Sequence, residues 1–154
     1  MQSRRRHPQI RICKLTNNMS SLNLLKSEMW IFYDKWRKTG SYCPAFKENI
    51  TISLKGWNHI LGQSGYKKRN TGDVFRRLSL LPHAKQIIET SHTIQNKKFK
   101  GQGKYKRIFY TLEALVNDLE RGKLVEKKVR VILIEDNKGH KIFLSVMSKD
   151  VQKD

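Results

Sequence analysis

The sequence has few acidic residues, and it has no long apolar run. Asp and Glu number 13 against 32 Lys and Arg, which gives a formal net charge of +19 over 154 residues. No stretch approaches the roughly 20 consecutive apolar residues of a membrane-spanning helix. Arg4, Arg5 and Arg6 are not followed by the apolar segment of a secretory signal. We therefore expect a protein of the cytoplasm that does not contact a membrane.

The sequence also lacks the residue spacings of metal and cofactor sites. Cys13 and Cys43 form no C-x-x-C pair, which predicts free thiols in a reducing compartment. The five histidines show no zinc-ligand spacing, and the few acids are too scattered to predict a metal-dependent nuclease. No glycine-rich nucleotide motif and no G-x-S-x-G are present. We therefore expect neither a metal nor a cofactor.

The basic residues are concentrated in one part of the chain. Residues 65–110 hold twelve Lys and Arg against two acids, whereas residues 111–136 hold six acids and five bases. A concentrated basic face is typical of polyanion binding, because each neutralised phosphate releases condensed counterions. We expect the partner to be RNA, either single-stranded or tRNA-like. The alternative is a solvated basic face without a partner, whose self-repulsion would destabilise the folded state.

The hydrophobic pattern predicts an α+β fold, with helices packed on one face of a small antiparallel sheet of about four strands. An N-terminal helix with an apolar stripe precedes this core. Gly56 is expected to end the first strand, and Asn137 and Gly139 to form a tight turn between the last two. The expected elements are a helix at 20–39, a strand at 49–55, a helical turn at 57–61, helices at 73–81 and 82–90, and strands at 104–111, 128–135 and 141–148.

Two basic, glycine-containing segments, 63–72 and 96–104, are predicted to be loops. The segment 112–121 fits either a helix that ends at Gly122 or a continued, bulged strand. The expected organisation is a basic tail and amphipathic helix over 1–47, an α+β domain over 48–148 and a loose tail over 149–154.

His59 is the first candidate for a catalytic role. It follows the predicted strand and Gly56, so we expect it in the first turn of a short helix. A helix N-terminus disfavours the imidazolium, so His59 would stay neutral and act as a base near pH 7. The alternative is a histidine that only packs beside Trp57.

Two arginines and a serine complete the expected site. One of Arg76 and Arg77 must point away from the core, and a guanidinium beside a cleft holds phosphate bidentately. Ser145 is a small hydroxyl among large apolar neighbours, where it can donate to a phosphate oxygen. The alternatives are a solvated helix face and a tolerated serine. Further candidates are Lys67, Lys68, Arg69, Lys98 and Lys100 for binding RNA phosphates, and Tyr66, Phe99 and Tyr110 for stacking on unpaired bases.

Three segments resemble the phage-type branch of the barnase–EndoU–colicin–RelE ribonuclease superfamily. They are G-W-N-H-I-L at 56–61, R-R-L-S-L-L-P at 76–82, and the hairpin V-R-V-I-L-I-E-D…K-I-F-L-S-V-M over 129–147. The resemblance covers roughly residues 48–148. It implies a four-stranded antiparallel sheet and favours a continued strand at 112–121.

The resemblance also implies a function, namely metal-independent RNA cleavage in which a ribose 2′-hydroxyl attacks the adjacent phosphate. The matching site positions are His59, Arg77 (or Arg76) and Ser145. The barnase subgroup also uses a glutamate base, and no acid of this sequence is placed for that role. Such an enzyme would act as a toxin, with an acidic antitoxin or immunity protein as its protein partner. The alternatives are a non-catalytic RNA- or DNA-binding module of the same fold, and an accessory protein that docks to an acidic partner.

Overall fold

The computed structural model describes residues 18–63 and 65–149, so the predictions for the basic tail before residue 18, for Cys13 and for residues 150–154 lie outside the described residues. The elements are α2 (Asn18–Thr39), β1 (Ser41–Cys43), β2 (Glu48–Ile50), α3 (Leu54–Leu61), α4 (Thr71–Ser79), α5 (Leu81–Thr90), β3 (Asn96–Lys100), the 3₁₀ turn η2 (Gly103–Tyr105), β4 (Arg107–Glu120), β5 (Lys123–Glu135) and β6 (Lys141–Lys149).

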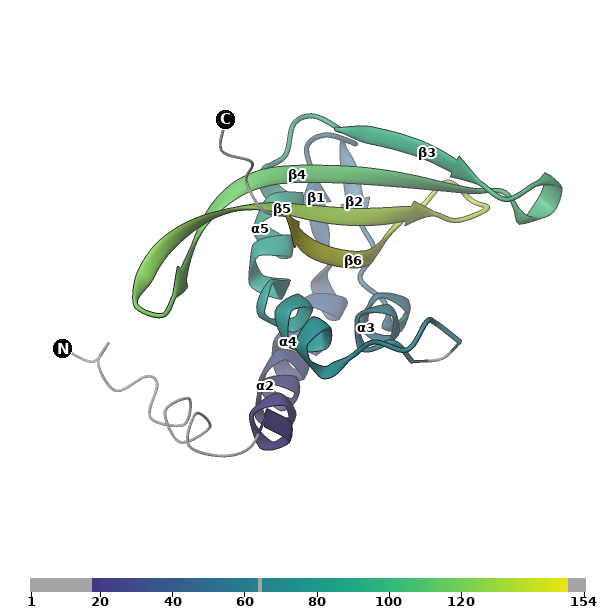
Figure 1. Cartoon of the computed structure of the whole chain (residues 1–154). Coiled ribbons are helices and arrows are strands. Elements are labelled where there is room, and N and C mark those ends of the chain that lie inside the picture. The colour runs from purple at the N-terminus through teal and green to yellow at the C-terminus, as the bar shows by residue number, and fades with distance from the viewer. Residues whose placement is uncertain (1–17, 64, 150–154) are drawn as a thin grey trace.

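The fold is α+β, as predicted, and its main layer is a four-stranded antiparallel sheet in the order β3-β4-β5-β6 (Figure 1). The helices lie on one face of this sheet, and β1 and β2 form a separate two-stranded sheet. A single parallel bridge from Thr51 to Ile142 connects the chain after β2 to β6. No helix in the described part of the chain is long and apolar enough to cross a membrane.

The core lies between the sheet and the helices. On β5 every second residue, Val129, Val131 and Leu133, is fully buried, as a strand with one buried face requires. The apolar stripe predicted for α2 is confirmed, because Leu22 and Trp36 are buried in this core and Leu25, Met29 and Phe32 pack against it. Tyr33, which was not part of that stripe, is buried in the same core. The N-terminal helix and the sheet therefore form one hydrophobic core.

The strand predicted at 49–55 is wrong in extent. β2 ends at Ile50, and Ser53 already caps α3, with its Oγ accepting a hydrogen bond from the Lys55 amide at 3.3 Å. Gly56 does not end a strand but lies inside α3. A side chain there would place its Cβ 2.7 Å from the Phe143 carbonyl oxygen, so this glycine permits close packing of α3 against β6.

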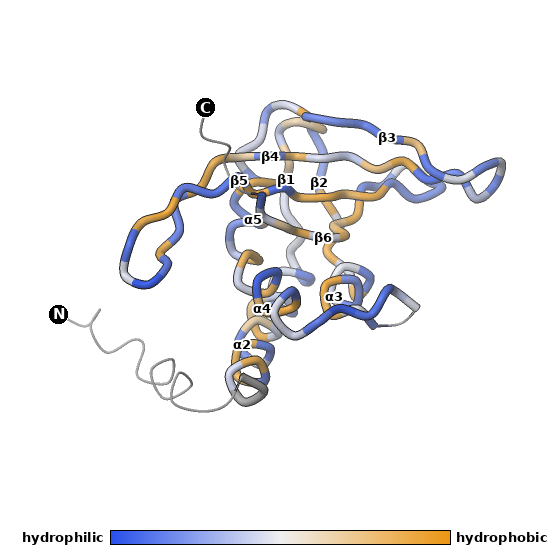
Figure 2. Tube along the Cα trace, in the orientation of Figure 1, coloured by the Kyte–Doolittle hydropathy of each residue, from blue (hydrophilic) through white to orange (hydrophobic). Residues whose placement is uncertain are grey.

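The loop predicted at 96–104 is also wrong in its first half, which is the edge strand β3. Asn96 pairs with Thr111 and Lys100 pairs with Arg107. Figure 2 shows that β3 is largely hydrophilic, whereas β4, β5 and β6 carry hydrophobic stretches. Because every β3 residue is exposed, the strand has no buried face that a hydropathy pattern could indicate.

β4 begins at Arg107 rather than at 104, and it continues through the segment 112–121, as the resemblance implied. Beyond the sheet, residues 115–120 of β4 pair only with residues 123–128 of β5, and the two strands form an arm that extends from the body (Figure 1). Leu115 and Leu119 are exposed on this arm. The apolar spacing that suggests a helix therefore belongs to a strand pair.

The remaining elements agree with the predictions to within a few residues. The helix expected at 73–81 is α4, which ends at Ser79, and α5 begins one residue before Pro82. The tight turn predicted between β5 and β6 is present, and Gly139 has a φ of 85° there, whereas Asn137 does not adopt a positive φ.

Candidate functional site

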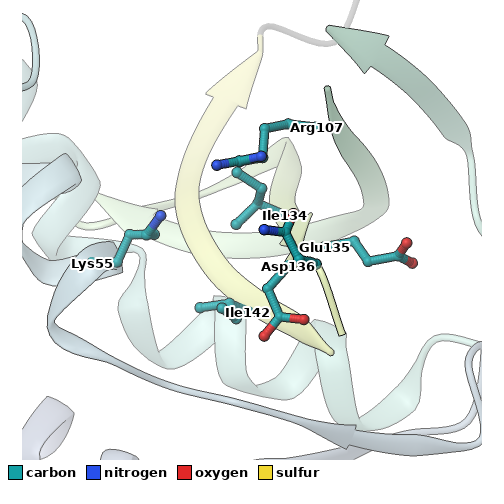
Figure 3. Close-up of a pocket in the computed structure, with 7 residues that line it drawn as sticks. Lys55, Arg107, Ile134, Glu135, Asp136 and Ile142 are labelled. Atoms are coloured by element: carbon teal, nitrogen blue, oxygen red, sulfur yellow. The ribbon is translucent and has the colours of Figure 1, made fainter. Parts of the chain in front are cut away.

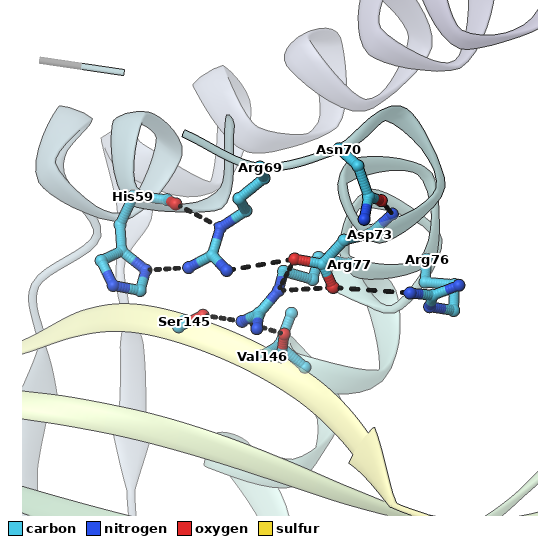
Figure 4. A network of polar contacts seen from close by, with 8 residues as sticks. All are labelled: His59, Arg69, Asn70, Asp73, Arg76, Arg77, Ser145 and Val146. Atoms are coloured by element: carbon cyan, nitrogen blue, oxygen red, sulfur yellow. Dashed lines mark hydrogen bonds and ion pairs between the residues drawn. The ribbon is translucent and has the colours of Figure 1, made fainter. Parts of the chain in front are cut away.

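Three of the residues predicted for catalysis lie at one place, where α3 and α4 meet the edge strand β6 (Figure 4). Arg77 Nη1 donates to Ser145 Oγ at 2.7 Å and to the Val146 carbonyl oxygen at 3.3 Å. Ile132 of β5 pairs with Ser145 of β6, but the next residue, Leu133, pairs with Phe143, so β6 has a bulge immediately before Ser145. Ser145 is 1% exposed. The arginine therefore joins α4 to an irregular point of the sheet edge. Because Ser145 is buried, the prediction that its hydroxyl donates to a phosphate oxygen is wrong, and its Oγ instead holds Arg77.

Asp73 is the centre of the network. Its carboxylate accepts from Arg77 Nε at 3.2 and 3.3 Å and from Arg69 Nη1 at 3.1 Å. Its amide donates to the Asn70 side chain at 2.8 Å, which caps the start of α4. The helix cap and the ion pairs thus hold both guanidinium groups in fixed positions.

Arg69 connects this network to His59. Its Nε donates to the His59 carbonyl oxygen at 3.0 Å, and its Nη2 lies 3.3 Å from His59 Nδ1. A guanidinium can only donate, so Nδ1 is the acceptor and the proton of the neutral ring is on Nε2. We call His59, Arg69, Asp73, Arg77 and Ser145 the arginine cluster.

His59 does not lie in the first turn of its helix, as predicted, but in the last turn of α3, which Gly62 ends with a φ of 70°. A helix C-terminus stabilises the imidazolium, so the helix dipole does not keep this ring neutral. Burial, together with the positive charges of Arg69 and Arg77, lowers the pKa of His59 to about 4. His59 is thus neutral at pH 7, but the cause differs from the one predicted.

Asp73 is ionised at neutral pH. Burial raises the pKa of its carboxyl, but the charges and hydrogen bonds of Arg77 and Arg69 outweigh burial and hold that pKa below its usual value. Asp73 is therefore an acceptor that orients arginines and not a proton donor.

Positive charge exceeds negative charge at the site. Arg76 Nη2 lies 3.8 Å from Asp73, so three guanidinium groups face one carboxylate. The Arg76 side chain is 67% exposed, whereas the Arg77 side chain is 13% exposed. The exposed Lys67 and Lys68 precede Arg69 on the same loop. Such an arrangement can bind an anion with Arg76 and the lysines and stabilise its charge with the inner arginines.

The aromatic and lysine candidates are divided between two places. The Tyr66 ring packs edge-on against His59 with 4.7 Å between ring centroids. Phe99, Lys98 and Lys100 lie on β3, at the opposite edge of the sheet from β6. Tyr110 is 6% exposed and its hydroxyl donates to Glu135, so the prediction that it stacks on a base is wrong.

Sequence reasoning missed Asp73 and Asn70 as members of the site. A local pattern could have indicated Asp73, because it lies four residues after Arg69 and four before Arg77, the spacing of ion pairs on a helix. Among the described residues, no group of three or more His, Cys, Asp and Glu side chains is placed to hold a metal ion. Comparisons with protein-family models, curated proteins and solved structures find no match for this chain.

Proposed function

We propose that the protein is a metal-independent endoribonuclease whose arginine cluster binds the scissile phosphate. The observation that carries this proposal is the convergence of His59, Arg77 and Ser145, which come from two helices and a strand far apart in the chain. These are the three positions that the resemblance to the phage-type ribonuclease branch implies. The excess of guanidinium groups over carboxylates supports an anionic substrate.

In the binding step, the RNA phosphate replaces part of the internal network. Arg76 and the loop lysines attract the backbone, and Arg69 turns from His59 Nδ1 to a phosphate oxygen. Arg77 stays on Asp73 and Ser145, so its position costs no reorganisation during the reaction. The same movement frees the basic nitrogen of His59.

In the chemical step, His59 Nδ1 takes the proton of the ribose 2′-hydroxyl. The 2′ oxygen forms a bond to phosphorus, the bond from phosphorus to the 5′ oxygen breaks, and the imidazolium returns the proton to that oxygen. The products are a 2′,3′-cyclic phosphate and a 5′-hydroxyl. Burial is the largest cause of the lowered pKa of His59, and the charges of Arg69 and Arg77 add to it. The bound phosphate offsets only the arginine charges, so binding raises that pKa part of the way toward the range of a general base.

The test is incubation of a defined RNA with the protein in EDTA. We expect internal cleavage with cyclic phosphate ends, and we expect no cleavage at a position where the ribose is 2′-deoxy. A His59→Ala preparation purified in parallel controls for contaminating ribonuclease. Cleavage of the 2′-deoxy position, or none of the normal RNA, would contradict the proposal.

A second candidate is a non-catalytic RNA-binding module. The observation that favours it is the saturation of the cluster: Arg69 occupies His59 Nδ1, and three arginines hold the single carboxylate of Asp73. A module of this kind binds RNA with the same salt dependence but leaves it intact.

We propose the cytoplasm as the place of action, in agreement with the buried free thiol of Cys43. A ribonuclease there would be a toxin, and an acidic antitoxin would neutralise its basic face.

A further inference from the structure

We infer that β3 and the turn after it form a second binding surface, which takes single-stranded nucleic acid by stacking its bases. We call Lys97, Phe99, Tyr105 and Lys106 the β3 surface. Because β3 and β6 are the two edges of the sheet, three strand spacings of about 4.8 Å each, or about 14 Å, separate this surface from the strand that carries Ser145.

The β3 surface exposes two aromatic rings within a group of lysines. Phe99 is 52% exposed and Tyr105 is 69% exposed. Lys106 Nζ lies 4.3 Å from the centroid of the Phe99 ring, and Lys97 Nζ lies 5.3 Å from it. Lys104 Nζ lies 5.3 Å from the centroid of the Tyr105 ring. Each ammonium lies over the face of its ring as a cation–π contact, so a base that stacks on that face displaces the ammonium toward the phosphate of the same nucleotide.

Lysines on an edge strand have a structural role as well, because they prevent pairing with a second sheet. That role accounts for Lys98 and Lys100, but not for an exposed Phe99 between them. Among the described residues, no carboxylate lies within 4.0 Å of the lysines of β3 or of the turn after it. The positive charge of this surface is therefore available to a polyanion.

The chemistry of the surface selects a single-stranded ligand. Exposed aromatic rings beside lysines bind unpaired bases by stacking while the lysines contact the backbone. In a duplex the bases already stack on one another and present no free face. Stacking does not read the 2′-hydroxyl, so single-stranded DNA should bind here as well as RNA.

Basic side chains connect this surface to the arginine cluster. Lys100 on β3 pairs with Arg107 on β4, and Arg107 and Lys55 both line a surface pocket over Ile142 (Figure 3). Lys55 lies four residues before His59 on α3, which places the two side chains on the same side of that helix. One strand of nucleic acid can therefore contact both edges of the sheet.

Two acids line the same pocket, but each is engaged by other groups. Asp136 Oδ1 accepts from the amides of Lys138 and His140, both at 2.9 Å. Glu135 accepts from the Tyr110 hydroxyl at 3.0 Å. Figure 3 shows the Glu135 carboxylate directed away from Lys55 and Arg107. These hydrogen bonds leave both acids negatively charged, so a strand that crosses the pocket contacts Lys55 and Arg107 and passes beside two carboxylates, of which Glu135 is paired with Lys141 at 3.4 Å.

This inference adds a substrate-binding surface to the proposed nuclease, and its test measures binding alone. The probe is a fluorescent oligouridine, compared by anisotropy with an oligomer of the same length and charge that lacks bases. The variants are the double substitution Phe99→Ala with Tyr105→Ala, the conservative Phe99→Trp, and Leu124→Ala as a control at another exposed apolar side chain. Thermal melting verifies that each variant folds.

We expect the double variant to bind oligouridine roughly tenfold or more weakly and to bind the base-free oligomer as the wild type does. Phe99→Trp and Leu124→Ala should retain wild-type affinity for both. If the double variant lost affinity equally for the two oligomers, or lost none for either, the inference would be overturned. No loss for either oligomer would point to an acidic protein as the ligand of this surface. If the stacking contrast is present but RNA is never cleaved, this inference stands and the proposed function fails.

Discussion

At the scale of single residues, the fold determines the charge of His59. We predict that proton NMR titration of the wild-type protein gives an imidazole pKa of about 4, because burial and the charges of Arg69 and Arg77 oppose protonation. In Arg69→Gln the pKa should move upward, since one of those charges is removed. A wild-type pKa near the ordinary value of about 6.5 would show that the ring is not held in this environment.

The lowered pKa of His59 also fixes the sign of a pH effect on stability. The unfolded chain binds a proton at this histidine below about pH 6.5, whereas the folded chain resists it until about pH 4. The stabilising contribution of neutral His59 is therefore complete above pH 6.5 and is lost as the pH falls toward 4. His59→Asn should reduce this part of the acid destabilisation.

Ser145 gives a second prediction at this scale. Ser145→Ala removes the 2.7 Å hydrogen bond from Arg77 Nη1 and leaves a guanidinium on a side chain that is only 13% exposed with fewer acceptors. We expect the free energy of unfolding to fall by about 1.5–3 kcal/mol, as measured by urea denaturation. Ser148→Ala, at an exposed position of the same strand, is the control and should change little. Equal stabilities of the two variants would contradict the account of Ser145.

The sequence was sufficient to nominate His59, Arg77 and Ser145, because a histidine after a strand, paired arginines and a small hydroxyl in a strand are unusual locally. It did not reveal how they are held. The contact between Arg77 and Ser145 spans 68 residues, and no local pattern encodes it. The spacing around Asp73 was local and could have been read, but a lone acid beside three arginines has the appearance of an ordinary helix start.

At the scale of elements, the contact of α3 with β6 places His59 beside Arg77. Gly56→Ala should lower the free energy of unfolding by about 1–3 kcal/mol, since the new methyl would meet the Phe143 carbonyl oxygen at 2.7 Å and the Tyr33 hydroxyl at 2.6 Å. Gly72→Ala, in the first turn of α4, is the control. Its Cβ meets nothing closer than 3.6 Å, so thermal melting should show no loss. A tolerated Gly56→Ala would mean that α3 and β6 are less closely packed.

Elements that bury one side were predictable, and those without a buried side were not. α2, α5, β5 and β6 carry apolar residues at the spacing of their own geometry. β3 is exposed at every position, and the arm formed by β4 and β5 extends beyond the helices, so neither has a second layer to impose a pattern. The length of β2 was predicted wrongly for another reason. Ser53 ends the extended segment because it caps the start of α3.

At the scale of the whole molecule, the net charge of +19 predicts a steep salt dependence of RNA binding. The slope of log K against log salt should be about −0.7 for each phosphate neutralised on a single strand, so several contacts reduce affinity strongly between low and moderate salt. Anisotropy at a series of salt concentrations measures it. An RNA affinity that stays constant over these salt concentrations would contradict the proposal that the protein binds a polyanion.

The most direct test of the central claim compares His59→Asn with the wild type in a single-turnover cleavage assay in EDTA. The asparagine oxygen can accept from Arg69 in place of Nδ1, so the network is retained while the proton-transfer group is lost. His92→Asn, at an exposed histidine, is the matched control. The same preparations are compared for RNA affinity and for Tm.

We predict that His59→Asn slows cleavage by about 10²–10⁴-fold, because an imidazole supplies proton transfer and little ground-state binding. Its RNA affinity and its Tm should stay close to those of the wild type, and His92→Asn should cleave normally. If His59→Asn cleaves RNA at the wild-type rate, His59 is not the proton-transfer group and the arginine cluster is not the catalytic site.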